Sequence, residues 1–211
     1  MVSKTREKLI DVARQLFAHK GIENTTMNDI AAASDKGRRT IYTYFKNKRE
    51  IYNAVIERES DLLLKRLRNV AESDDDPETK VEKYMMVRFE MFAESMPSRT
   101  SPLKAILGRD VRRAHRIRKI ALEKELILFR NVISEGVARG VFDPVQAGRL
   151  PIVGAMVVNG LDFYSIHGDF NELGITYEEA RDTIVRFALD AILIKANPDI
   201  ENKNNPSAPQ P

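Results

Sequence analysis

The strongest constraint on the fold lies in residues 25–48, where two short helical patterns flank a turn. Thr26 precedes Asp29 by three residues, which is the spacing of a capping box that starts a helix. The segment 35–37, Asp-Lys-Gly, interrupts the pattern, and glycine adopts backbone angles that other residues avoid. Asp35 can also take the left-handed conformation at modest cost. The segment therefore predicts two short helices joined by a tight turn, which is the layout of a helix-turn-helix.

The second short helix has an apolar side and a polar side. Ile41 and Phe45 lie one turn apart and are expected to point into the core. Arginine matches guanine edges through its two-pronged donor geometry, whereas threonine and tyrosine reach phosphates. Exposed arginines are also common on solvated helix faces. Arg38 and Arg39, however, open a short helix directly after a turn, and this is the position from which side chains of a helix-turn-helix enter the major groove of DNA. The side chains on the polar side are Arg38, Arg39, Tyr42 and Thr43.

A wider pattern surrounds this motif from about Lys4 to Val55. It begins with an apolar first helix that stops at Gly21, and it ends with Tyr-x-Tyr-Phe-x-x-Lys over residues 42–48. In these features the sequence resembles the TetR-type bacterial transcription regulators. Positions 35 and 36 depart from the family's pattern, which usually has Gly and a small apolar residue there. The sequence therefore does not define the angle at which the second short helix would enter a DNA groove.

The resemblance implies roles for individual residues on double-stranded DNA. Lys48 also follows from local chemistry, because Asn47 is a good N-cap with Glu50 three residues later, and helix N-termini bind phosphate. Tyr44 has an alternative role in the small core beside Phe45. The residues expected to face bases are Arg38, Arg39, Thr40 and Thr43. The residues expected to hold phosphates are Thr26, Tyr42, Tyr44 and Lys48.

The charge distribution agrees with a DNA-binding N-terminus. The chain of 211 residues has a formal net charge of only +3, but residues 1–52 hold 11 Lys and Arg against 6 Asp and Glu. Positive charge therefore concentrates where the helix-turn-helix lies, as an electrostatic footprint requires. The stretch 109–119 is also strongly basic, and it could be a second nucleic-acid patch, a site for an acidic effector or a solvated helix face.

Composition limits the other classes of function. The chain has no cysteine, which excludes disulfides, thiolate metal sites and cysteine nucleophiles. The three histidines, His19, His115 and His167, show no metal-ligand spacing, so we expect no metal and no cofactor. The sequence has no membrane-length apolar run, no signal peptide, no Gly-rich phosphate loop and no His-carboxylate spacing. We therefore expect a cytoplasmic protein without membrane partners, and not an enzyme.

The rest of the chain has helical periodicity nearly throughout, so the predicted fold class is all-α. We expect a long helix over residues 48–72, followed by an acidic loop with Pro77. Further helices are expected over 79–95, 111–139 after a separate segment near 103–107, 143–167 and 176–196. The predicted domains are a three-helix helix-turn-helix domain over 1–47, a helical effector-binding and dimerisation domain over 48–196, and a disordered tail over 197–211.

The last two helices are unusually apolar, and a helix that is hydrophobic on most sides must be buried on most sides. They can lie inside a monomer core or form a dimer interface. The dimer is favoured, because reading a palindromic operator with two helices about 34 Å apart requires a two-fold homodimer. The residues predicted at the interface are Val153, Met156, Val157, Ile184, Phe187, Ala188 and Ala191.

One further stripe could line a site for a largely apolar small-molecule effector, because methionine is flexible and polarizable. Such stripes are, however, more often ordinary core than the wall of a ligand site. No charged residue is predicted to be buried at a position that would identify the chemistry of the effector. The stripe consists of Met85, Met86, Phe89, Phe92 and Met96.

The sequence thus predicts a DNA-binding transcription regulator, as a dimeric repressor that an effector releases from its operator. The alternative is an effector-independent DNA-binding regulator whose second domain only dimerises or docks a protein.

Overall fold

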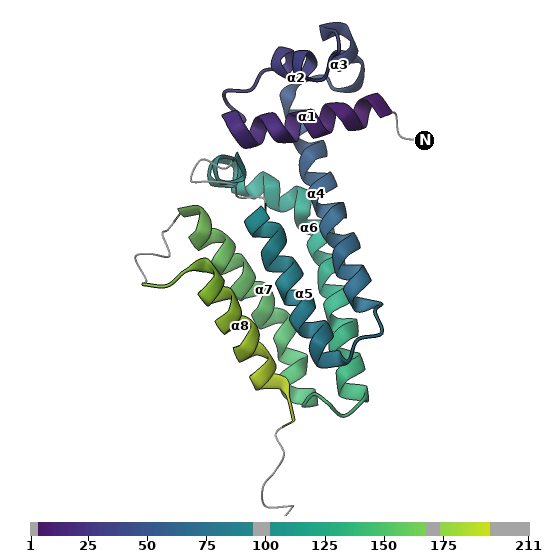
Figure 1. The fold of residues 1–211 in the computed structure, drawn as a ribbon, viewed down its shortest axis with the longest axis vertical. Helices are drawn as coiled ribbons and strands as arrows, with labels where there is room; N and C mark the ends of the chain where they lie inside the picture. Colours follow the sequence, from purple (N-terminus) through teal and green to yellow (C-terminus); the bar gives the residue numbers. More distant parts are fainter. Residues whose placement is uncertain (1–3, 95–101, 168–173, 195–211) are drawn as a thin grey trace, which may run out of the picture.

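The computed structural model describes residues 4–94, 102–167 and 174–194, and every regular element in these ranges is a helix (Figure 1). The all-α prediction is therefore confirmed. Helices α1–α3 lie at one end of the molecule, and the long α4 leads from them into a bundle with the later helices (Figure 1). The helices are α1 Lys4–Lys20, α2 Met27–Ala33, α3 Arg38–Tyr44, α4 Lys48–Ala71, α5 Pro77–Glu94, α6 Pro102–Ala138, α7 Pro144–His167 and α8 Tyr177–Ile192.

The first three helices pack around a small core of their own, to which the start of α4 contributes. Leu9 and Ala13 of α1, Ile30 of α2, Ile41 of α3 and Ile51 of α4 are all fully buried in this cluster. Burial of one aliphatic side chain of this size stabilises a fold by about 1.5–3 kcal/mol. The helix-turn-helix formed by α2 and α3 is therefore held by apolar packing against α1 and the start of α4.

A second core fills the bundle formed by α4–α8. Leu67 of α4, Val81 and Phe89 of α5, and Ile192 of α8 are buried in it together with Phe142, which precedes α7. Helix α4 contributes to both cores, so it connects the three-helix end of the molecule with the bundle. Figure 1 also shows the first part of α6 lying below α1, before the helix runs down the bundle.

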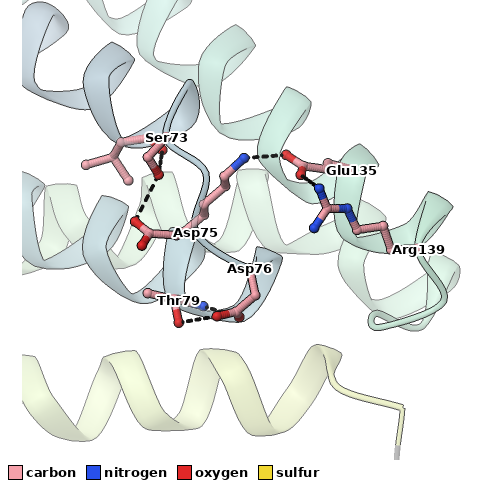
Figure 2. Close-up of polar contacts among 8 residues, drawn as sticks. Ser73, Asp75, Asp76, Thr79, Glu135 and Arg139 are labelled. Atoms are coloured by element: carbon pink, nitrogen blue, oxygen red, sulfur yellow. Dashed lines mark hydrogen bonds and ion pairs between the residues drawn. The ribbon is translucent and has the colours of Figure 1, made fainter.

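The acidic loop between α4 and α5 is used for local capping (Figure 2). Asp76 accepts hydrogen bonds from the backbone N–H of Thr79, at 3.0 Å, and from its hydroxyl, at 2.7 Å. These bonds lower the pKa of Asp76. Hydrogen bonds from Lys83 and then Ser73 lower the pKa of Asp75. Asp76 therefore caps the start of α5, and Asp75 is held by Ser73 and Lys83.

A cation is buried beside this loop. The Lys80 ammonium is almost fully buried and lies 2.8 Å from Glu135 of α6. Arg139 pairs with the other oxygen of Glu135, also at 2.8 Å (Figure 2). A single carboxylate thus serves two cations and joins α5 to the end of α6.

Two predicted helix boundaries were wrong. In one case the hydrogen bonds of a continuous helix outweigh the local sequence signal, and in the other a contact with a distant segment does. The expected break between residues 107 and 111 is absent, because α6 runs unbroken from Pro102 to Ala138. A helical glycine such as Gly108 costs only about 1 kcal/mol, which is too little to end a long helix. Helix α8 ends at Ile192 instead of residue 196, because Leu193 leaves the helix to form a β-bridge with Phe142. The predicted tail over 197–211 lies outside the described residues.

Gly136 in α6 supports a testable prediction about this core. An added Cβ would lie 2.1 Å from two ring carbons of Phe142, which is itself fully buried. Gly136→Ala should therefore destabilise the protein by about 1–3 kcal/mol through overpacking, although alanine favours a helix. Urea unfolding followed by circular dichroism measures this. Gly148→Ala in α7 is the matched control, because its Cβ would meet nothing within 4 Å, and it should be neutral or stabilising. Equal stability of the two variants would contradict the packing argument.

Candidate nucleic-acid interface

The predicted capping box at the start of α2 is present. The Thr26 hydroxyl accepts a hydrogen bond from the Asp29 N–H at 3.1 Å, and an Asp29 oxygen accepts one from the Thr26 N–H at 2.8 Å. The backbone bond from Thr26 is the main cause that lowers the pKa of Asp29. Thr26 is exposed at this N-terminus, where a phosphate finds free N–H groups nearby.

The turn between α2 and α3 uses the left-handed conformation at Asp35, whose φ is 54°. The N–H of Lys36 donates to the carbonyl of Ala31 at 2.9 Å, and the N–H of Asp35 donates to that of Ala32 at 3.1 Å. These two bonds form a Schellman motif, which usually has glycine where Asp35 stands. Lys8 of α1 pairs with the Asp35 carboxylate at 3.1 Å. The departure from the usual glycine is therefore accommodated without loss of the turn.

Helix α3 presents its polar side to solvent as predicted. Ile41 and Phe45 are buried, whereas Arg38, Arg39 and Thr43 are exposed. The apolar pair fixes the rotation of the helix about its axis, so it also fixes which side chains point outward. Thr40, which was expected to face bases, is half-buried, and Tyr42 is exposed.

Tyr44 and Lys48 have structural contacts besides the phosphate roles expected of them. Tyr44 is half-buried and packs against the N-terminal core, in agreement with the alternative considered for it. The Lys48 ammonium donates to the backbone carbonyls of Ile22 and Glu23, before α2. An ammonium has three donors, so one donor remains for a phosphate. Lys48 therefore fastens α4 to the loop before α2, a contact that the sequence pattern did not reveal.

Helix α1 contacts the end of α3 and the side of α4 through charged side chains, and the sequence analysis did not predict these contacts. The Arg6 guanidinium lies 5.3 Å from the centroid of the Phe45 ring at the end of α3. Arg58 of α4 pairs with Asp11 of α1 at 2.8 Å, and Arg14 of α1 pairs with Glu59 of α4 at 2.7 Å. These partners lie far apart in the sequence, so no local spacing connects them. Helix α1 thus joins α3 to α4.

Residues 9–55 match the family model described as bacterial regulatory proteins, tetR family. This N-terminal segment is thus of the TetR type. The probable acrEF/envCD operon repressor of Escherichia coli K12 is 46% identical over 50 residues, which are 24% of this chain and 23% of that protein. The chain thus matches about a quarter of the length of this relative.

Solved structures extend the likeness of this chain beyond residues 9–55 to the whole fold. A transcriptional regulator from Cytophaga hutchinsonii has a TM-score of 0.71 over 89% of this chain and 98% of its own, at 23% identity. The SmeT–triclosan complex has a TM-score of 0.64 over 99% of this chain and 100% of that chain, at 19% identity. At these identities the likeness shows the fold, with a helix-turn-helix followed by a helical bundle.

The predicted effector stripe lies partly in the core of the bundle. Met85 and Phe89 are buried there, and Met86 is half-buried. The side chain of Phe92 and the whole of Met96 lie outside the described residues. The stripe therefore behaves as core where it can be followed.

The sequence pattern marked no charged residue of the bundle as buried, but the structure buries an ion pair there. The side chains of Arg88 on α5 and Glu125 on α6 are only 8% and 9% exposed, and they lie 3.3 Å apart. The hydroxyl of Tyr84 donates to the Glu125 carbonyl at 2.6 Å. Burial, and then the charge of Glu125, raises the pKa of Tyr84 well above its usual value, so the hydroxyl stays a donor. The pair was missed because its members lie on different helices.

Most of the predicted interface residues of α7 and α8 lie at the surface. Met156 is 70% exposed and Phe187 is 74% exposed. Val153 and Ala191 are also exposed, and Val157 and Ile184 are half-buried. Ala188 instead lies in the chain's own core, so it cannot contribute surface to a partner. Sequence reasoning missed three exposed apolar residues nearby, which are Val145, Ile152 and Ile194.

The described residues also bear on metal sites and on membrane spans. No group of three or more His, Asp and Glu residues there could hold a metal ion. Among the described helices, none combines the length and apolar character that a bilayer-spanning helix requires. Of the side chains in the basic stretch over 109–119, only that of Lys119, which is exposed, falls within the described part, and the others lie outside it.

Proposed function

We propose that this chain is a TetR-family protein, namely a dimeric, sequence-specific DNA-binding repressor that a small-molecule effector releases from its operator. The observation that carries the proposal is the exposed polar side of α3, fixed in rotation by the burial of Ile41 and Phe45. In this arrangement residues 1–47 bind DNA, and residues 48–196 dimerise and bind the effector.

The roles of the DNA-facing side chains follow from their chemistry. Arg38 and Arg39 can each give two parallel hydrogen bonds to a guanine edge, and Thr43 can contact a thymine methyl group. Thr40 takes part at the edge of this surface, since it is half-buried. The proposed phosphate contacts surround the recognition helix and are Thr26, Tyr42, Tyr44 and Lys48.

The apolar surface on α7 and α8 supports the proposal of a homodimer. Large apolar side chains such as Met156 and Phe187 are more than two-thirds exposed in the single chain. Burying such side chains against a second copy removes this apolar area from water. A two-fold dimer also places two copies of α3 about one helical turn of DNA apart, as a palindromic operator requires.

Two relatives support repression and an effector. The Escherichia coli relative is named as a probable repressor, and the structure with the same fold over the full chain is a complex with triclosan. A ligand bound in the bundle would act through α4, which contributes to both cores. It must bind the non-DNA-binding arrangement more tightly than the DNA-binding one, because equal affinity shifts nothing.

A second candidate is an effector-independent regulator whose bundle only dimerises or docks a protein. The burial of Met85 and Phe89 in the core favours it, because these side chains then fill space instead of lining a site. A screen for ligands that release bound DNA separates the two functions.

The test of DNA reading begins with selection of binding sites from a random duplex library. The wild-type protein should enrich a palindromic motif and bind it far more tightly than scrambled DNA in fluorescence anisotropy across a salt series. Binding of both DNAs with equal affinity and equal salt dependence would overturn sequence-specific recognition.

Arg39→Ala should then cost about 1–3 kcal/mol on the selected operator if Arg39 pairs with a guanine. Its affinity for scrambled DNA should change far less. Arg130→Ala on the exposed side of α6 is the matched control, because it removes the same charge away from α3. Equal losses on both DNAs would reduce Arg39 to a phosphate contact.

A further inference from the structure

The two neighbouring arginines that open α3 differ in their surroundings. The guanidinium carbon of Arg38 lies 5.7 Å from the centroid of the Tyr42 ring. Arg39 has Thr43 at the same spacing along the helix, and the Thr43 hydroxyl donates to the Arg39 backbone carbonyl at 3.1 Å. Arg38 therefore has an aromatic neighbour one turn along the helix, and Arg39 does not.

The helix itself creates this stacking arrangement. Side chains four residues apart lie on the same side of a helix, one above the other. The planar, weakly hydrated guanidinium group of arginine stacks on aromatic faces, which carry negative potential. Among the residues that the structure describes, no carboxylate pairs with Arg38, so the Tyr42 ring is the contact that restrains its guanidinium.

We propose that the ring of Tyr42 is a positioning residue for Arg38 and thereby sets the base preference at the position that Arg38 reads. The inference rests on the proposed function, because it requires Arg38 to contact a base. A long arginine side chain loses rotamer freedom when it binds a base edge. A stacked guanidinium has lost part of that freedom before DNA arrives, so binding costs less.

This role differs from the phosphate contact proposed for Tyr42, and the two can be separated chemically. The phosphate contact needs the hydroxyl, whereas the positioning role needs the ring. Tyr42→Phe keeps the ring and loses the hydroxyl, and Tyr42→Leu loses both. Tyr42 is 42% exposed and leucine is a strong helix former, so both variants should fold.

The decisive experiment is a pair of double-mutant cycles on the selected operator. We expect Tyr42→Leu to weaken binding about two- to fivefold more than Tyr42→Phe does. The extra loss should vanish when Arg38 is already alanine, and it should persist when Arg39 is alanine. In site selection, Tyr42→Leu should lose preference at the two symmetry-related positions read by Arg38 and keep the rest of the motif. An equal extra loss in both cycles, or none in either, would overturn the positioning role.

A second measurement needs no DNA. In NMR spectra of the free protein, the Arg38 side-chain Nε–H and Cδ–H signals should carry a ring-current shift that persists in Tyr42→Phe and disappears in Tyr42→Leu. Unchanged Arg38 shifts in Tyr42→Leu would overturn the stacking itself. Failure of the wild-type protein to select any motif would instead overturn the proposed function, so the two failures can be told apart.

Discussion

Phe187→Asp is expected to convert the protein to monomers and to abolish tight operator binding. Phe187 is 74% exposed on α8 and lies among the apolar side chains proposed to meet a second copy. In a two-fold interface the substitution removes two aromatic anchors and buries two like charges, neither of which has a partner. Separate monomers also lose the second half-site, so affinity should fall about 10²- to 10⁴-fold. Sedimentation equilibrium measures the mass, and fluorescence anisotropy measures DNA binding.

A matched control is available on another helix. Ile127 of α6 is 56% exposed and is not among the residues proposed for the interface, so Ile127→Asp should stay dimeric and bind the operator like wild type. Circular dichroism should show unchanged helicity for both variants. A Phe187→Asp protein that still sediments as a dimer would place the interface elsewhere.

The sequence predicted those parts of the fold that local chemistry decides. Thr26 starts α2 through a capping box, and Asn47 caps α4, as their spacing indicated. Each of these signals needs only a side chain and the backbone three residues later. The burial of Ile41 and Phe45 likewise follows from helical periodicity alone, so the exposed side of α3 was predictable.

Features that depend on contacts between distant segments could not be predicted in this way. The end of α8 is set by the bridge between Phe142 and Leu193, which are far apart in the sequence. The bonds from Lys48 to the loop before α2 are also non-local. The sequence pattern therefore identified the candidate site residues, whereas their contacts with distant segments became visible only in the folded structure.

The buried ion pair in the bundle leads to the largest expected change in stability. Arg88→Met should lower the free energy of unfolding by about 3–5 kcal/mol, because it removes that guanidinium from Glu125 and leaves the carboxyl group in a buried site. Methionine has similar bulk, so the loss reflects charge more than packing. Urea unfolding of the full chain at neutral pH measures the change.

The same physics predicts that a second substitution restores stability. Replacing both charges, with Arg88→Met and Glu125→Leu, removes the cost of burying them and leaves apolar groups between α5 and α6. The double variant should therefore be close to wild type or more stable. Tyr84→Phe is a useful calibration, because it removes only the hydroxyl bond to the Glu125 carbonyl and should cost about 1 kcal/mol. If the double variant is as unstable as Arg88→Met, the loss comes from packing, and the charge argument fails.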